Sequence, residues 1–455
     1  MNQATRLPGW LVPAAATAVG VTFVAGILVI DHPGAVALPA ALLAFAFALS
    51  RLFRNPIELY AGFLLVIVNL DHFKISEALS LDVAVSSAAL LLLLLRAAVV
   101  VPRTVSACPA VERWLIVFLA AAGISVLVST FPTQSIKRYG RELEYLAIVF
   151  LLLRHPLTRT EIRWLLGATL VASIVPCVLG LAGYAMRIES LLGQGLHLEN
   201  LYGSEPRVRS TLSHPVVFSI YLSVVLTFTL GLWMAGKVLP RGLTGPIAAL
   251  QMVTLYVTYG RTGWIGFAAG FAALLWLQGR KKLLLLGAPV LPVLAWRVVP
   301  NFQERWETVL SATGENSLLW RLGLWDYALR IYPERPVFGS GIGTFLEYVD
   351  YLQGFNAHQT WVGLLIETGL VGTLAFLGLL LVVGRELLRA ARRAVPEERP
   401  VAQGAVAVWF GLLAASLASE PFGMPSAAVY VWTLFAVALN LPGTRDPRSH
   451  AVRSG

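Results

Sequence analysis

Fourteen long apolar segments recur along this chain of 455 residues, and they constrain its fold more than any other feature. A helix needs ~20 apolar residues to cross a bilayer, and only helices and closed barrels keep their backbone polar groups paired there. Unbroken apolar runs such as Ala88–Leu95 lack the alternation of a barrel strand. The sequence therefore predicts an all-α polytopic integral membrane protein.

The number of spans follows from the lengths of these segments. They comprise residues 10–30, 34–50, 57–70, 83–101, 112–130, 139–154, 162–184, 215–236, 243–259, 262–279, 282–299, 360–384, 403–419 and 425–441. Segments 34–50 and 57–70 are shorter than a usual span, so we expect about 12–14 transmembrane helices. The first segment follows Arg6 and lacks a small-residue cleavage site, which predicts a retained helix rather than a removed signal peptide.

Composition excludes an ordinary soluble enzyme. Only 13% of the residues are charged and the mean hydropathy is +0.72, whereas soluble domains carry roughly 25% charged residues. The two cysteines, Cys108 and Cys177, lie far apart in the sequence. They predict neither a disulfide framework nor a cysteine-based metal site.

The net charge of +10 has two parts. Cytoplasmic loops of membrane proteins are rich in lysine and arginine, and with both termini in the cytoplasm the inner side holds 22 of the 35 basic residues. The other 13 lie outside, where orientation does not require them. They predict an anionic ligand at the outer face, and the charge gives no reason to expect binding to nucleic acid.

We divide the chain into three parts on this pattern. Residues 1–200 form the N-terminal transmembrane helices, residues 201–385 a core, and residues 386–455 the C-terminal transmembrane helices with a cytoplasmic tail. The core includes one long outer loop, residues 300–357. Loops of this length are usually functional.

Apolar residues recur within that loop at i, i+4, i+7 and i+11, which predicts an amphipathic helix against the membrane surface. This stripe consists of Leu318, Leu322, Trp325 and Leu329. Pro333 and Pro336 end the predicted helix. A turn follows, with glycines at positions 339, 341 and 343, and then a second short amphipathic piece.

His358 lies at the outer mouth of the segment 360–384. An imidazole titrates near neutral pH and is able to activate a hydroxyl group, although a histidine at this place also serves to cap a helix. Glu367 follows nine residues later, ~13 Å deeper and near the opposite face of a regular helix. We therefore expect a structural partner for Glu367 rather than a dyad with His358.

Arginines gather in four outer segments. Guanidinium groups match phosphate oxygens with a planar fork of donors, while the alternative for each arginine alone is contact with lipid head groups or a solvated face. The residues concerned are Arg138 and Arg141 at the start of one span, Arg207 and Arg209 shortly before His214, Arg261 in a glycine-flanked turn, and Arg321 in the long loop. Their joint occurrence favours a site for an anion.

Motifs for nucleotide or metal chemistry are absent from the sequence. It contains no phosphate-binding loop, no His-Glu-x-x-His and no Asp-x-Asp pair. We therefore expect neither a cofactor nor a metal.

Three motifs follow one another around the long loop. They are YGRTGW at residues 259–264, PVFGSGIGTF at residues 336–345, and AHQ at residues 357–359 followed by LLIETGLVG at residues 364–372. This ordered set resembles the O-antigen ligase and O-antigen polymerase superfamily of bacterial envelope glycosyltransferases over about residues 200–385. One departure is Gln359, where the family often has asparagine after the histidine.

The resemblance implies a multi-span membrane glycosyltransferase of the broad C type (GT-C-like), which acts at the periplasmic face of the inner membrane. Such enzymes use a glycan carried by undecaprenyl diphosphate, without metal or nucleotide. The essential arginines of the family fall on Arg261 and Arg321, and its histidine falls on His358.

From the residues and the resemblance together we expect an inverting, metal-independent O-antigen ligase that transfers the glycan to lipid A–core oligosaccharide. His358 would be the general base, or a phosphate ligand if a bound diphosphate keeps it protonated. The expected diphosphate ligands are Arg138, Arg141, Arg207, Arg209, Arg261 and His214. An O-antigen polymerase and a protein O-oligosaccharyltransferase need the same donor chemistry, and a transporter of an anionic lipid-linked glycan is an alternative of another class.

Overall fold

The computed structural model describes residues 56–70, 74–76, 79–80, 106–187, 196–197, 206–285, 317–349 and 357–441. The predicted segments 10–30, 34–50 and 83–101, and most of 282–299, lie outside the described residues. The number of spans therefore stays a prediction.

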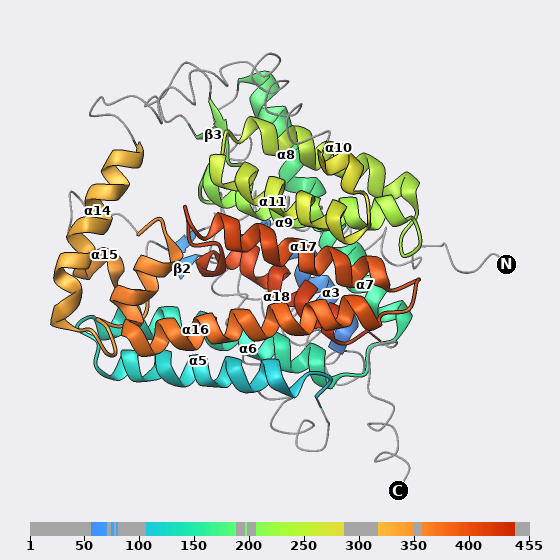
Figure 1. Ribbon diagram of the computed structural model, residues 1–455. Coiled ribbons are helices and arrows are strands. Elements are labelled where there is room, and N and C mark those ends of the chain that lie inside the picture. The colour runs from blue at the N-terminus through green and yellow to red at the C-terminus, as the bar shows by residue number, and fades with distance from the viewer. Residues whose placement is uncertain are drawn as a thin grey trace, which may run out of the picture.

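Helices make up nearly all of the described structure (Figure 1). In chain order they are α3 (Pro56–Ile67), α5 (Pro109–Leu127), α6 (Pro132–Arg154), α7 (Arg159–Ala172), α8 (Ile174–Met186), α9 (Pro215–Ala235), α10 (Arg241–Val257), α11 (Arg261–Leu277), α14 (Ser317–Ile331), α15 (Phe345–Tyr348), α16 (Thr360–Arg393), α17 (Arg399–Ala415) and α18 (Pro425–Leu439), with the 3-10 turns η2 (Tyr332–Glu334) and η3 (Pro421–Gly423). Two short antiparallel pairs are the strands: β1 (Lys74–Ser76) with β2 (Leu79–Ser80), and β3 (Leu196–His197) with β4 (Arg207–Val208).

The helices confirm the predicted all-α membrane fold. Within the described residues, four helical stretches are long and apolar enough to cross a membrane: Pro109–Leu127, Arg159–Met186, Pro215–Ala235 and Thr360–Arg393. The shorter apolar helices are α3, α11, α17 and α18. Each predicted apolar segment within the described residues coincides with a helix or, at 162–184, with the pair α7 and α8.

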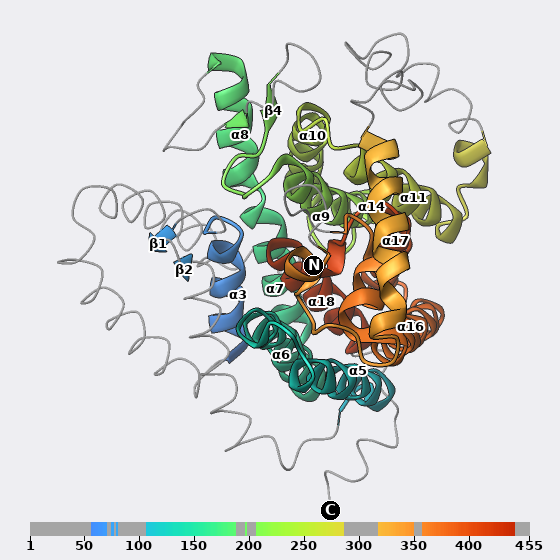
Figure 2. The same cartoon turned by 90° about the vertical axis from the view of Figure 1, so that its left-hand side faces the viewer.

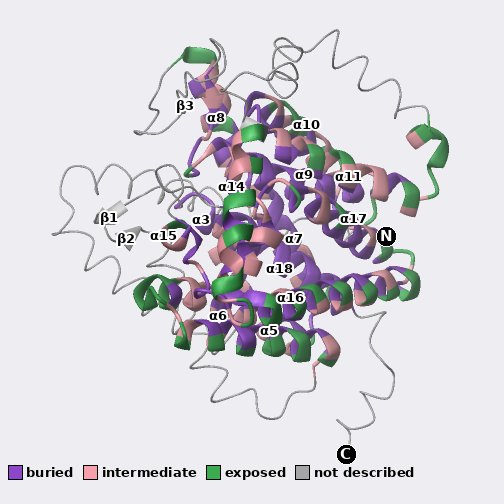
Figure 3. Cartoon of the chain, turned by 60° about the vertical axis from the view of Figure 1, so that its left-hand side comes forward, coloured by how far each residue is buried: buried purple, intermediate pink, exposed green. Residues whose placement is uncertain are grey.

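The centre of the bundle is formed by α9, α17 and α18, which are buried along most of their lengths (Figure 3). Helix α11 packs against α17 through small residues. A Cβ added at Gly411 would lie 2.5 Å from the carbonyl oxygen of Gly266, and one at Gly270 would lie 3.0 Å from that of Ala407. Small residues let two helices approach closely, which is the usual packing between membrane helices.

A second group consists of α5, α6 and α16, and α14 crosses one end of the bundle, where it contacts α16 (Figure 2). The buried residues of α14 are Leu324 and Ala328. Leu322 and Leu329 of the predicted stripe are each 46% exposed, so the stripe identified the helix but not its buried face.

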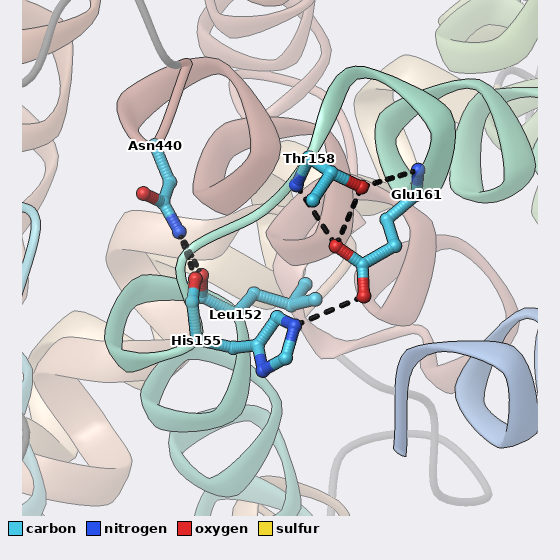
Figure 4. Close-up of polar contacts among 5 residues, drawn as sticks. All are labelled: Leu152, His155, Thr158, Glu161 and Asn440. Atoms are coloured by element: carbon cyan, nitrogen blue, oxygen red, sulfur yellow. Dashed lines mark hydrogen bonds and ion pairs between the residues drawn. The ribbon is translucent and has the colours of Figure 1, made fainter. Parts of the chain in front are cut away.

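At the opposite end of the bundle, polar contacts stabilise the turn between α6 and α7 (Figure 4). Thr158 and Glu161 form a capping box at the start of α7, and His155 Nε2 lies 3.0 Å from Glu161 Oε1. Asn440, just beyond α18, donates to the carbonyl oxygens of Leu152 and His155. This contact joins the ends of α6 and α18.

Helix α16 is interrupted at Gly369, where φ is 63° and ψ is −167°. In a continuous helix the N–H groups of residues 370 and 371 would donate to the carbonyls of residues 366 and 367. Here they donate to the carbonyls of Pro336 and Val337, at 2.9 and 3.2 Å. The freed carbonyls of Ile366 and Glu367 accept from the N–H groups of Ser340 and Gly341, both at 2.9 Å. The turn at residues 336–341 therefore satisfies the groups that the break exposes.

Glycine is required both in the turn at residues 336–341 and at the break in α16. Gly339 has a φ of 73°, and a Cβ there would lie 2.5 Å from the carbonyl oxygen of Glu367. A Cβ at Gly369 would meet the carbonyl of Val337. The left-handed backbone and the close approach together exclude a larger side chain. The predicted glycine turn is thus confirmed, with a role in closing a helix break.

Replacing Gly339 with alanine is expected to lower the free energy of unfolding by about 1–3 kcal/mol, through overpacking and backbone strain. The measurement is the Tm of the purified protein in detergent micelles. Gly242→Ala in α10 is the matched control, because that residue is exposed and an added Cβ has no atom within 4 Å. Equal Tm values for the two variants would contradict the role of the turn.

Candidate active site at one end of the bundle

The connection between α17 and α18, residues 416–424, organises one end of the bundle. The carbonyl of Ser416 accepts from the N–H of Thr360 at 3.1 Å, and the carbonyl of Ser419 accepts from its hydroxyl at 2.9 Å. The carbonyl of Ala418 accepts from Arg321 at 3.3 Å. We call residues 416–424 the platform loop, because it fixes both the start of α16 and an arginine of α14.

His358 lies just before α16, with a left-handed backbone whose φ is 50°. The side chain of Gln359 caps α16 by accepting from the N–H of Val362. Trp325 of α14 donates to the carbonyl of Ala357 at 2.7 Å, and the ring of Trp320 contacts the His358 imidazole edge-on, with centroids 5.9 Å apart. The imidazole is therefore held between α14 and the start of α16, and capping is done by its neighbour.

The environment of His358 favours the neutral imidazole. Burial, followed by the positive charge of Arg321 and the electrostatic effect of the His214 ring, lowers the pKa of His358 to about 4. A neutral histidine is able to accept a proton. The same interaction shows that two of the predicted site residues, Arg321 and His214, lie near His358 although they are far apart in sequence.

His214 has a structural role that the sequence analysis did not predict. Its Nδ1 atom accepts from the N–H of Val216 at 3.1 Å and so caps α9. In the neutral ring this contact leaves the proton on Nε2. His214 therefore presents a donor, rather than an acceptor, on its other side.

The two arginines before α9 differ in their contacts. Arg207, in β4, donates to the carbonyl of Thr258 at 3.3 Å, which joins this strand to the turn before α11. The Nε atom of Arg209 is buried and has no hydrogen-bond partner within the described residues. Burial lowers the pKa of Arg209. Arg209 therefore carries a buried donor that the described residues leave unsatisfied.

Arg261 is the first residue of α11 and is half-buried. Its position depends on the glycines on either side. A Cβ at Gly260 would collide with the side chain of Ser219, and one at Gly263 would lie 2.5 Å from the Ser219 carbonyl oxygen. The turn is thus pressed against α9, and this confirms the predicted glycine-flanked turn.

Arg138 is placed differently from the other predicted ligands. It forms an ion pair with Glu142 at 2.9 Å and donates to the carbonyl of Gly423 in the platform loop at 2.6 Å. Arg141 is half-buried one turn further along α6. A carboxylate therefore already balances the charge of Arg138.

Sequence analysis missed Glu420 of the platform loop. Its side chain lines a small cavity beneath the first turn of α16 together with Arg138, Glu142 and Glu367, and its Oε1 atom is buried without a hydrogen-bond partner within the described residues. The available signal was an ionisable residue in a very short connection between two apolar segments, since such residues are seldom incidental in membrane proteins.

These features define a polytopic α-helical membrane protein with a basic, histidine-containing site at one end of its bundle. Residues 246–377, less than a third of the chain, match the family model described as "O-Antigen ligase". The matched segment contains Arg261, Arg321 and His358. The resemblance that the three motifs indicated is thereby confirmed.

A curated relative supports the same family. The chain is 25% identical over 283 residues to the exopolysaccharide production protein ExoQ of Rhizobium meliloti (strain 1021). The alignment covers 57% of this chain and 61% of ExoQ, so the chain spans about three fifths of the length of this relative.

Replacing Arg321 with glutamine is expected to raise the pKa of His358 from about 4 toward its ordinary value of about 6.5, because a nearby positive charge is removed while burial remains. The measurement is an NMR titration of the His358 ring in protein labelled at histidine Cε1. Arg330→Gln on the same helix is the control, since Arg330 is exposed and paired with Asp326. A pKa of His358 that is the same in both variants would contradict the proximity of Arg321.

Proposed function

We propose that this protein is a membrane glycosyltransferase that moves a glycan from undecaprenyl diphosphate to lipid A–core oligosaccharide, which is the reaction of an O-antigen ligase. The observation that carries the proposal is a neutral, half-buried His358 beside Arg321 and His214. Both Arg321 and His358 lie in the segment that matches the O-antigen ligase model.

The proposed reaction breaks the bond between C1 of the donor sugar and the lipid diphosphate. The oxygen of the acceptor hydroxyl attacks C1 from the opposite face, so the configuration inverts, and His358 takes the hydroxyl proton. The diphosphate leaves with the bonding electron pair. Its negative charge raises the pKa of His358 from the value in the free protein, which makes the imidazole a better proton acceptor during the reaction.

Fixed cations stabilise the charge that develops on the leaving diphosphate. We assign this role first to Arg209, Arg261 and Arg321, and Arg207 and His214 add donors on the same side. Arg138 and Arg141 would act from further away. Arginine suits the task because it keeps its charge and offers paired donors to phosphate oxygens.

We place the reaction at the periplasmic face of a bacterial inner membrane, with both termini in the cytoplasm. The distribution of basic residues supports this orientation, since it puts the largest clusters inside. Residues 201–385 form the proposed core, to which α6 and the platform loop contribute.

A polymerase is the second candidate, and the relative favours it. ExoQ is described by its role in exopolysaccharide production, which fits an enzyme that extends a polysaccharide. A polymerase would use the same donor chemistry but pass the glycan to another lipid-linked unit. A protein O-oligosaccharyltransferase differs again only in its acceptor.

Cells that lack this protein are expected to retain full-length glycan on the lipid carrier and to lose it from lipopolysaccharide. The measurement compares lipopolysaccharide and lipid-linked glycan in deleted and complemented cells. Single repeat units on the carrier would identify a polymerase instead. Normal amounts of both products would contradict a glycosyltransferase and favour a transporter.

Complementation with His358→Ala is expected to fail because the proton acceptor is absent, and normal complementation by this variant would remove His358 from the mechanism.

Replacing Arg261 with lysine is expected to weaken binding of undecaprenyl diphosphate roughly tenfold, because one charge remains while the paired donors are lost. The measurement is binding of undecaprenyl diphosphate to the purified protein in detergent. Arg280→Lys, at the opposite end of α11, provides the control. Equal affinity in both variants would exclude paired contacts between Arg261 and phosphate.

A further inference from the structure

A large cavity lies between α11, α16 and α17, away from the candidate active site. Its volume is about 770 Å³, which is within the range of pockets that hold organic ligands. Helix α17 packs against both α11 and α16 (Figure 1). The cavity walls are mainly apolar and include Ala273, Trp276, Leu388 and Phe410.

The cavity lies at one surface of the membrane, opposite the surface with the candidate active site. Helices α11 and α17 each have 17 residues, so each is roughly 25 Å long, close to the ~30 Å of the hydrocarbon core. Helix α11 starts at Arg261 and reaches the cavity with its last two turns. Helix α17 starts at the cavity with Arg399 and runs back to the platform loop. The cavity is therefore at the depth of lipid head groups.

Two arginines give the cavity its charge. Arg392, near the end of α16, and Arg399, at the start of α17, both line it and both are exposed. The guanidinium of Arg392 has no hydrogen bond or ion pair within the described residues, and that of Arg399 donates only to the carbonyl of Ala394, at 3.4 Å, in this part of the chain. Most of their N–H donors are therefore available to a ligand.

Carboxyl groups close to these arginines in the sequence are engaged elsewhere or lie outside the cavity. Glu386 pairs with Arg385 and Arg389, at 2.8 and 2.7 Å. Glu398 pairs with Arg159 of α7 at 3.5 Å, and Glu397 is not among the residues that line the cavity. None of the described residues in the lining is acidic. The cavity therefore favours an anion.

The apolar wall indicates what kind of anion fits. Trp276 and Phe410 are 58% and 40% exposed, so large apolar surfaces lie beside the arginines. The Nζ atom of Lys281 lies 4.3 Å from the centre of the Trp276 ring. Aromatic and basic side chains of this kind are typical of the membrane–water interface. A small soluble anion would leave the apolar wall uncovered, whereas a phospholipid has both an anionic head group and apolar chains.

We propose that this cavity binds an anionic phospholipid, with its phosphate between Arg392 and Arg399 and an acyl chain along Ala273, Trp276 and Phe410. Basic pockets between membrane helices bind anionic head groups in this way. The lipid joins the ends of α11, α16 and α17 and so stabilises the bundle. This site goes beyond the proposed transferase function and shares no residue with the candidate active site.

The test measures lipid binding to the purified full-length protein in detergent by native mass spectrometry, with phosphatidylglycerol and the zwitterionic phosphatidylethanolamine as probes. We expect tighter binding of phosphatidylglycerol. Arg392→Gln combined with Arg399→Gln should lower that affinity roughly 25-fold, about fivefold for each arginine. Arg389→Gln combined with Arg393→Gln is the matched control, because it removes the same charge from the end of α16 but neither residue lines the cavity. This control should bind phosphatidylglycerol as the unchanged protein does.

A second variant keeps both arginines and fills the cavity. Ala273→Phe should lower the affinity for phosphatidylglycerol, because the ring occupies the space of the acyl chain. Ala268→Phe on the same helix is the control, since Ala268 is exposed and lies outside the cavity lining. In addition, phosphatidylglycerol should raise the Tm of the unchanged protein more than that of the variant without Arg392 and Arg399, because a ligand that binds the folded state stabilises it.

Three results would overturn the inference. Equal affinity for the two lipids in the unchanged protein would exclude recognition of an anionic head group. An equal loss of affinity in both pairs of arginine variants would indicate a general effect of charge. Unchanged affinity in the variant without Arg392 and Arg399, or in Ala273→Phe, would show that the lipid binds elsewhere, as expected if a protein segment fills the cavity.

Discussion

Four backbone hydrogen bonds join the interrupted helix α16 to the glycine turn, and the rest of the site depends on this contact. A helix break inside a membrane protein leaves carbonyl and N–H groups that lipid cannot satisfy. Residues 336–341 supply two acceptors and two donors to the break at Gly369. These hydrogen bonds fix α14 and α15, which flank the turn, relative to α16. It therefore sets where Arg321 lies relative to His358.

Charge is divided between two neighbouring regions. In the cavity beneath α16, Arg138 is balanced by Glu142 and lies near two further carboxyl groups. On the other side of His358, Arg321 and His214 lower the pKa of the imidazole, and the buried Nε of Arg209 has no partner within the described residues. In the proposed function, the anionic donor binds in the second region and His358 lies between the two regions.

Some features of the site were predictable from the sequence, and others were not. The turn at Arg261 and the separate turn with glycines at 339, 341 and 343 were predictable, because glycine tolerates the close approach and left-handed backbone that tight turns require. The buried face of α14 was not predicted, because Leu324 and Ala328 are buried while Leu322 and Leu329 of the predicted stripe are exposed. Glu420 was missed, since a single carboxyl group in a short connection has no periodicity or motif to identify it.

The sequence by itself determined the membrane environment, the helical fold class and the residue types of the site, because apolar length and fixed charge are properties of each segment alone. It also indicated, through three ordered motifs, a resemblance to the O-antigen ligase family. Only the tertiary structure decided which segments meet: the platform loop joins Thr360, Arg321 and Arg138, which lie more than fifty residues from it. Those contacts use backbone carbonyls, which every residue carries. For that reason no pattern of side chains in the sequence could have predicted them.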